Sequence, residues 1–264
     1  MDYDNYTTLG FHREGAILTV SLDRPEVLNA ANAQMEIELG RFFVEVVDDE
    51  QTRVVVLTGS GKTFSAGGDF DYMRALLEDP ALLRKAIPHA KRLIFSLLDC
   101  PKPVIAKING HAVGFGATLA LFCDVTFAAD HARIADPHVA IGLVAGDGGA
   151  IIWPQLIGYN RAKEYLFTGE PLLAPEAARI GLINHAVPAS ELDDRVNEYA
   201  NKVAAMPIHA VRWTKTTVNL GLKQLAHSMM DASFAYEVLS SATEDHREAV
   251  AALTEKRKPT FKGE

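Results

Sequence analysis

The sequence is poor in the features that mark secreted and membrane-spanning proteins. Its two cysteines, Cys100 and Cys123, stand in apolar surroundings, which favours buried thiols over a disulfide. No apolar run approaches the roughly 18 residues that span a bilayer. The acidic, polar start at 1–5 does not have the pattern of a secretory or transit peptide. We therefore expect a cytoplasmic protein with no membrane association.

Clustered basic residues and metal-ligand spacings are also scarce. Acidic side chains outnumber basic ones by 34 to 26, which gives a net charge of −8 and argues against a nucleic-acid partner. The nine histidines show no His-x-x-x-His spacing and do not cluster with cysteine, so no metal site is predicted. No serine occupies a Gly-x-Ser-x-Gly elbow, which excludes that hydrolase signature.

Two glycine-containing stretches invite a nucleotide-binding interpretation, and both lack a required glycine. The stretch 59–63 follows a strand, but Val56 stands where a phosphate-binding loop needs its first glycine. The Gly114-Phe115-Gly116 turn lacks the third glycine of a dinucleotide fingerprint. Neither stretch predicts a nucleotide site.

What the sequence does contain is an alternation of strands and helices. With 264 residues and 48% hydrophobic content, it is long enough for one large domain or a domain with an appendage. Apolar runs predict strands at 16–22, 53–58, 103–108, 124–128 and 133–135. Helical patterns occupy 32–48, 71–77, 80–98 (with Pro88 expected to kink or divide it) and 119–122. This order predicts an α/β fold with parallel crossover units.

The last third of the chain has a different character. The pattern is largely helical from Asp147 onward, apart from the stretch 181–187. Beyond Pro188 we expect only helices, at roughly 190–205, 208–222, 224–241 and 245–254.

Two glycine-containing turns stand at equivalent places, each after a buried strand and before a helix. They cover 64–69 and 109–118. Strand ends of a parallel sheet share one edge, so backbone N–H groups of both turns can meet there and bind one oxygen. The sequence thus predicts an oxyanion-binding site that needs no charged residue.

These turns also carry a family resemblance. The first reads Phe64-Ser65-Ala66-Gly67-Gly68-Asp69, and the second belongs to the stretch 102–116, KPVIAKINGHAVGFG. Together they resemble the crotonase (enoyl-CoA hydratase/isomerase) superfamily. Further matching segments extend the resemblance over nearly the whole chain, at 29–30, 123–124, 146–149, 166–169, 181–183 and 255–261.

The resemblance implies a fold, an assembly and a ligand. The fold is the crotonase (ClpP-like) α/β fold of stacked strand–strand–helix turns, with a core at 1–195 and a helical region at 196–264 that forms homotrimers or dimers of trimers. The ligand is an acyl-CoA thioester or a related small carbonyl compound, with coenzyme A as part of the substrate and no separate cofactor.

Position matching to the family assigns residues to the implied site. The two oxyanion-hole N–H groups fall on Ala66 and Phe115, and the Phe115 side chain is expected to narrow the acyl pocket. The coenzyme A part falls near Arg24, Val27 and Leu28, and near Lys258 and Phe261 of the same or a neighbouring subunit. The alternative for this basic tail is an ordinary solvated surface.

The chain departs from the hydratases of this family at both water-activating glutamates. These positions fall on Thr118 and His138, and an aspartate, Asp147, stands on a loop where hydratases have a small residue. The His138 and Asp147 pair resembles the β-diketone hydrolase branch of the 6-oxocamphor hydrolase type. We expect His138 to act as general base or acid, with Asp147 orienting it or relaying protons.

Plainer roles for the same residues stay open. His138 can be a turn histidine, Asp147 can cap the next helix, and Asp69 is expected to do so for its own helix. His111 is expected to be structural. Tyr236 and Glu237 are further candidates for the pocket.

The sequence thus predicts an enzyme of the enoyl-CoA hydratase/isomerase family, a lyase or isomerase that works through a stabilised enolate and not by two-glutamate hydration. The alternatives are a C–C hydrolase of a β-diketone that uses His138 and Asp147, and a non-catalytic acyl-CoA-binding member.

Overall fold

A computed structural model describes residues 3–264; the first two residues of the acidic start lie outside this range. The strands are β1 (Leu9–Glu14), β2 (Ile17–Leu22), β3 (Val54–Gly59), β4 (Val104–Ile108), β5 (Ala112–Val113), β6 (Val125–Ala129), β7 (Arg133–Ala135), β8 (Leu172–Leu173) and β9 (His185–Val187). The α-helices are α1 (Ala33–Glu45), α2 (Phe70–Glu78), α3 (Pro80–Asp99), α4 (Phe115–Leu121), α5 (Gly149–Ile157), α6 (Tyr159–Thr168), α7 (Ala174–Arg179), α8 (Leu192–Ala204), α9 (Ile208–Ser241) and α10 (Glu244–Thr254). Short 3₁₀ turns lie at Pro25–Val27, Val46–Asp48, His138–Ile141 and Ala189–Glu191.

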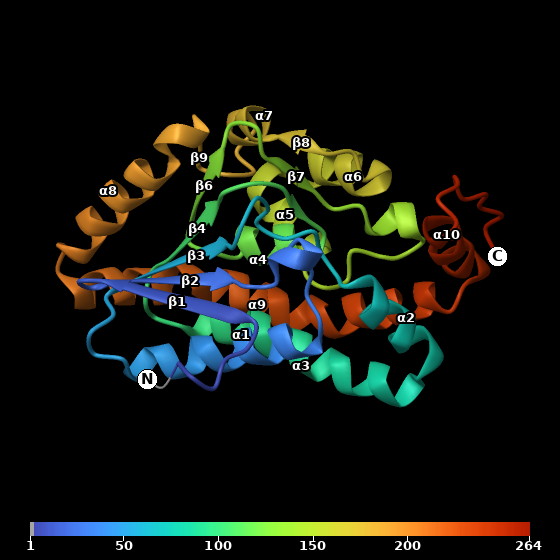
Figure 1. Cartoon of the computed structure of the whole chain (residues 1–264), viewed down its shortest axis with the longest axis horizontal. Helices are drawn as coiled ribbons and strands as arrows, with labels where there is room; N and C mark the ends of the chain where they lie inside the picture. The colour runs from blue at the N-terminus through green and yellow to red at the C-terminus, as the bar shows by residue number, and fades with distance from the viewer. Residues whose placement is uncertain (1–2) are drawn as a thin grey trace.

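A six-stranded sheet forms the centre of the molecule, in the order β1-β2-β3-β4-β6-β9 (Figure 1). All neighbours in it are parallel except β1 and β2, which form an antiparallel hairpin. A smaller sheet has the order β5-β7-β8. The parallel crossovers confirm the predicted α/β class.

Both faces of the main sheet are covered, as the unbroken apolar strand sequences require. In β3, Val55 and Leu57 join the larger core, while Val54 and Val56 point to the opposite face. The larger core includes α1, α3 and the second half of α9; the opposite face packs against α8. Burial on both sides holds the strand ends, and the turns that follow them, in fixed positions.

The predicted strands and most predicted helices are confirmed, and the structure adds β1 and the short strands β5, β8 and β9. The sequence LGFHRE of β1 mixes polar and charged residues without the expected alternation, so its pattern gave no strand signal. It is ordered by pairing with β2 over its whole length, from Leu9 opposite Leu22 to Glu14 opposite Ile17.

Two predicted divisions of helices do not occur. The helix α3 continues through Pro88, and α9 is a single helix of 34 residues where two were expected. Gly221 lies inside α9, where a glycine costs about 1 kcal/mol relative to alanine. Burial of Ala226, Met230 and Phe234 on the face of α9 that meets the core opposes that local cost.

The C-terminal region is helical, as predicted. The expected boundary after residue 195 falls inside α8, and the division into two parts stays a prediction. Cys100 and Cys123 are buried free thiols, which confirms that interpretation. Among residues 3–264, the search for a helix with the length and apolarity of a membrane span finds none.

Candidate active site

The two glycine-containing turns lie against each other, as predicted from their places after β3 and β4. Ser65 forms a parallel bridge with Ala112, and the Val113 N–H donates to the Ser65 carbonyl at 3.0 Å. A Cβ atom on Gly67 would lie 3.0 Å from the Val113 carbonyl oxygen, so glycine permits this close approach. The turns therefore form one continuous wall.

The backbone N–H groups of the first turn differ in whether they are free. The Ala66 N–H donates to the Leu28 carbonyl at 3.0 Å, and the Gly67 N–H donates to Ser65 Oγ at 3.2 Å. Within the part of the chain that the structure describes, Gly68 and Phe115 have no acceptor for their N–H groups. Ala66 lines the cavity, but its N–H already has an acceptor, which corrects its expected role as a free donor.

A cavity of about 460 Å³ opens beside these turns. Gly68 and Phe115 both line it, and the Phe115 side chain borders the space that it was expected to narrow. Most of the remaining wall is apolar and comes from α2, α3 and α9, with members such as Met73, Leu76, Leu77, Ile87, Ala90, Phe234 and Val238. The cavity thus offers N–H donors at one wall and an apolar lining for a carbon chain.

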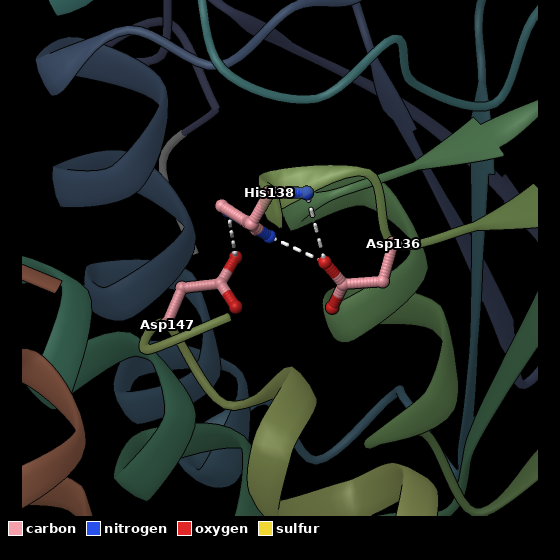
Figure 2. Close-up of side chains that lie close together, drawn as sticks. All are labelled: Asp136, His138 and Asp147. Atoms are coloured by element: carbon pink, nitrogen blue, oxygen red, sulfur yellow. Dashed lines mark hydrogen bonds and ion pairs between the residues drawn. The ribbon is translucent and has the colours of Figure 1, made fainter. Parts of the chain in front are cut away.

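His138 lies between two aspartates at this cavity (Figure 2). Its Nδ1 lies 2.5 Å from Asp136 Oδ1, and its Nε2 lies 3.7 Å from Asp147 Oδ2. All three side chains are largely shielded from solvent, with 13%, 1% and 11% of the side-chain surface exposed for His138, Asp136 and Asp147. The predicted pairing of His138 with Asp147 is present, and Asp136 is a partner that the sequence did not identify.

The two aspartates control the charge of His138. Burial lowers the pKa of the imidazole, but the Asp136 and Asp147 carboxylates outweigh it and raise the pKa to about 10. His138 is therefore a cation at neutral pH. This argues against a role as neutral general base in the resting protein.

Asp147 has one oxygen fixed and one free of hydrogen bonds. Its Oδ1 accepts from the Thr118 hydroxyl at 3.0 Å and from the Gly149 N–H at 3.2 Å, so it also satisfies the start of α5. Its Oδ2 is buried and has no hydrogen-bond partner among residues 3–264. Burial raises the pKa of this carboxyl, while the His138 cation opposes that rise.

Two further carboxyl groups line the cavity, Glu36 on α1 and Glu237 on α9. Burial, followed by nearby negative charges, raises the pKa of Glu36 to about 8. Burial also raises the pKa of Glu237 to about 8, against the His138 cation. Glu237 thus reaches the cavity, whereas Tyr236 is 62% exposed and does not line it.

The helical spacing of apolar residues in the sequence identifies both glutamates as candidate site residues. Glu36 precedes Leu39 and Phe43 by three and seven residues, which places it on the apolar face of α1. Glu237 follows Met230 by seven residues and Phe234 by three, on the buried face of α9. A charged residue within an apolar helix stripe is a candidate for a site.

We predict that replacing both glutamates by glutamine stabilises the protein at alkaline pH. A carboxyl pKa raised from 4.5 to about 8 on folding favours the native state below pH 4.5, and this stabilisation is lost as pH rises through about 8. At about 1.4 kcal/mol per pKa unit, the double variant should gain several kcal/mol of unfolding free energy near pH 8.5 and much less near pH 5. Thermal unfolding at both pH values checks this, with Glu164→Gln on the exposed surface of α6 as control. An equal change at both pH values would contradict it.

The other predicted residues lie outside the cavity lining. Arg24 pairs with Asp69 at 2.9 Å, and Asp69 caps α2 as predicted. Val27, Leu28, Lys258 and Phe261 are exposed, and with Arg24 their contact with coenzyme A stays a prediction.

Two further features of the site are the role of His111 and the spacing of the possible metal ligands Asp136, His138 and Asp147. His111 Nδ1 accepts from the Arg133 N–H at 3.1 Å, which agrees with a structural role. Ligand atoms of Asp136, His138 and Asp147 lie within 4.8 Å of one another, as in a metal site. The imidazole also lies between two carboxylates that favour its protonated form, an arrangement that suits proton transfer.

Comparisons with known proteins agree with this geometry. A family model described as enoyl-CoA hydratase/isomerase matches residues 12–264. The short-chain-enoyl-CoA hydratase of Clostridium acetobutylicum is 34% identical over 252 residues, covering 93% of this chain and 94% of its own. The 1,2-epoxyphenylacetyl-CoA isomerase of Escherichia coli is 32% identical over 254 residues, covering 96% and 97%. The crystal structure of an enoyl-CoA hydratase/isomerase from Mycobacterium paratuberculosis superimposes with a TM-score of 0.90 at 36% identity, covering 94% and 99%.

Proposed function

Because the chain belongs to the enoyl-CoA hydratase/isomerase family, whose members act on acyl-CoA thioesters, we propose that it moves the carbon–carbon double bond of an unsaturated acyl-CoA by acid–base catalysis. The observation that carries this proposal is the single free oxygen of Asp147. Asp147 Oδ2 is buried at the cavity without a hydrogen-bond partner among the described residues, while Oδ1 is held by Thr118 and Gly149. Such a carboxylate is positioned to accept a proton and return it.

The thioester oxygen is bound by the two free backbone donors. We place it between the N–H groups of Gly68 and Phe115, in place of the Ala66 N–H, which is bonded to Leu28. Donors fixed in this way stabilise the negative charge that develops on the oxygen when the neighbouring carbon loses a proton. Stabilisation of that enolate lowers the barrier to proton removal.

Proton transfer is assigned to Asp147. Its Oδ2 removes a proton from the carbon next to the double bond, which leaves a dienolate, and the same carboxyl delivers the proton to the other end of the conjugated system. No atom is gained or lost. Asp136 positions His138 through Nδ1, and the positive charge of the imidazolium favours the ionised form of Asp147 against the effect of burial.

Water addition by two glutamates does not suit this site. The hydroxyl of Thr118 donates to Asp147 and has no basic group with which to activate water. The Nδ1 atom of His138 is hydrogen-bonded to Asp136. The His138 imidazole, with a pKa of about 10, is protonated at neutral pH. The positions that hold water in the hydratases are thus occupied by a hydrogen-bond donor and a cation.

Hydrolysis of a β-diketone is the second candidate. The 3.7 Å separation of His138 Nε2 and Asp147 Oδ2 favours it, because a water molecule bound by this pair can be activated for attack on a carbonyl carbon. Gain of one water and C–C cleavage would then be the product signature.

The deciding experiment uses the purified protein with 3-enoyl-CoA, 2-enoyl-CoA and cyclic β-diketone compounds, followed by chromatography and mass spectrometry. Isomerisation gives a product of unchanged mass with a shifted double bond. A gain of one water on the enoyl-CoA compounds would replace isomerisation by hydration, and ring opening of the diketone would favour hydrolysis. Binding of acyl-CoA without turnover of any compound would support a non-catalytic member.

The assembly and the coenzyme A contacts complete the proposal. We propose that Arg24, Val27 and Leu28, with Lys258 and Phe261, contact the coenzyme A part in a cytoplasmic homotrimer or dimer of trimers. The surface exposure of Val27, Leu28, Lys258 and Phe261 supports it, since a large polar ligand needs accessible partners. Sedimentation analysis, together with coenzyme A affinity of a Lys258→Ala variant, tests these points.

We predict that Thr118→Val slows turnover about tenfold and changes its pH dependence. The variant loses the hydroxyl that donates to Asp147 Oδ1, and a lost hydrogen bond to the ionised form raises the pKa of the carboxyl. The acidic limb of the kcat profile should therefore move to higher pH. Thr118→Ser, which keeps the hydroxyl, is the control and should retain the original limb; the same profile in all three proteins would contradict the prediction.

A further inference from the structure

Glu36 and Glu237 take no part in the proton transfer proposed above, although both line the same cavity as Asp147. They come from α1 and α9, helices separated by most of the sequence. The Oε2 atom of each is buried and has no hydrogen-bond partner among residues 3–264. An unpaired buried carboxyl oxygen is destabilising, and two in one cavity point to a ligand that supplies a partner.

Glu36 and Glu237 face one space, since both line the same cavity, and their charges influence each other there. Burial is the main cause that raises the pKa of Glu36, and Asp147 and Glu237 raise it further. The titratable side chains that share the cavity with the two glutamates are Tyr72, His138, Asp147 and His246, with Asp136 behind His138. With pKa values near 8, Glu36 and Glu237 carry protons at neutral pH, and each then has an O–H group to donate.

We infer that the O–H groups of Glu36 and Glu237 bind a second carbonyl oxygen on the acyl group, so that the protein selects oxoacyl-CoA thioesters. The inference rests on the proposed function for the placement of the thioester itself. A ketone oxygen is an uncharged acceptor with two lone pairs, which suits two donors in an otherwise apolar wall that includes Met73 and Leu76.

A positively charged acyl group fits this cavity less well. The His138 imidazolium, paired with Asp136 and Asp147, carries the same sign as an ammonium group and would repel it. A plain alkyl chain would leave both glutamate O–H groups without an acceptor. The carbonyl oxygen is the ligand that satisfies the donors without adding buried charge.

The test measures binding, so that it does not depend on turnover. Saturated, non-reacting thioesters are titrated calorimetrically: hexanoyl-CoA, 4-oxohexanoyl-CoA, 5-oxohexanoyl-CoA and 5-ammoniohexanoyl-CoA. At about pH 6.5, at least one oxo compound should bind about tenfold more tightly than hexanoyl-CoA. Near pH 9, where the glutamates have lost their protons, this preference should fall below about threefold.

Two double variants separate the donor role from shape. E36Q/E237Q keeps an N–H donor at every pH and should keep the preference at both pH values. E36M/E237M removes donors at similar volume and should show no preference at either pH, and Glu164→Gln serves as the surface control. Thermal unfolding establishes that each variant is folded.

The outcomes distinguish this inference from the function beneath it. If all four thioesters bind alike, or if the ammonium compound binds most tightly, the selection of oxoacyl groups is overturned while acyl-CoA binding stands. If no thioester binds, the proposed action on acyl-CoA thioesters is itself contradicted.

Discussion

Asp147→Asn is expected to lower kcat by about 10³-fold, because the amide cannot accept and return the proton of the substrate. The expectation depends on the Oδ2 atom, which is buried at the cavity without a hydrogen-bond partner among residues 3–264. Asparagine has nearly the shape of aspartate, and its amide oxygen can still accept from Thr118 and Gly149. Steady-state kinetics on a 3-enoyl-CoA measures the loss, and KM should change by less than about threefold since the thioester is bound elsewhere.

Asp136→Asn is the matched control. Its carboxylate contacts His138 Nδ1 and stands behind the imidazole, so we expect a loss of about 10- to 100-fold with a changed pH profile. A fall in kcat of less than threefold for Asp147→Asn would mean that Asp147 only caps α5 and does not transfer the proton. Equal losses in the two variants would mean that the triad acts as one unit and not through Asp147.

Gly68→Pro is expected to lower kcat by about 10²- to 10³-fold, since it removes one of the two backbone donors that we propose for the thioester oxygen. Its N–H has no acceptor in the described part of the chain, in contrast to that of Ala66. Gly68→Ala keeps the N–H, and its Cβ would lie 3.3 Å from Met73 Sδ, at a side chain that can move. The alanine variant should therefore lose less than about tenfold.

Circular dichroism and thermal unfolding establish that the proline variant keeps its fold. A folded proline variant with kcat within threefold of the original protein would remove Gly68 from the site. A loss shared equally by the alanine variant would mean that space, and not the N–H, matters at this position.

Most of the fold follows from local pattern. The unbroken apolar run at 54–57 predicts a strand buried on both faces, and it lies between β2 and β4. The hairpin strand β1 was missed because its residues carry no apolar alternation, and its order comes from pairing with β2. The sequence predicts two helices where the structure has the single helix α9. Core packing outweighs the local cost of Gly221, and this packing cannot be seen in the local pattern.

The site was only partly predictable. His138 and Asp147 were expected to work together from family position, and the structure places them 3.7 Å apart. The choice between the Ala66 and Gly68 donors could not be made from the sequence, since it depends on where the Leu28 carbonyl lies. Asp136 lies two residues before His138 in the sequence, but only the structure shows that its Oδ1 atom contacts the Nδ1 atom of His138.

The sequence by itself determined the class of fold, the family and the two glycine-containing turns that lie against each other beside the cavity. These depend on periodic burial and on glycines, which act within a few residues of their own positions. Only the tertiary structure decided which N–H groups are free, that His138 is a cation, and that Glu36 and Glu237 face the same cavity as Asp147. The reason is physical: hydrogen-bond satisfaction and pKa values depend on burial and on charges within a few ångströms, and those neighbours come from α1, α9 and loops far apart in the chain.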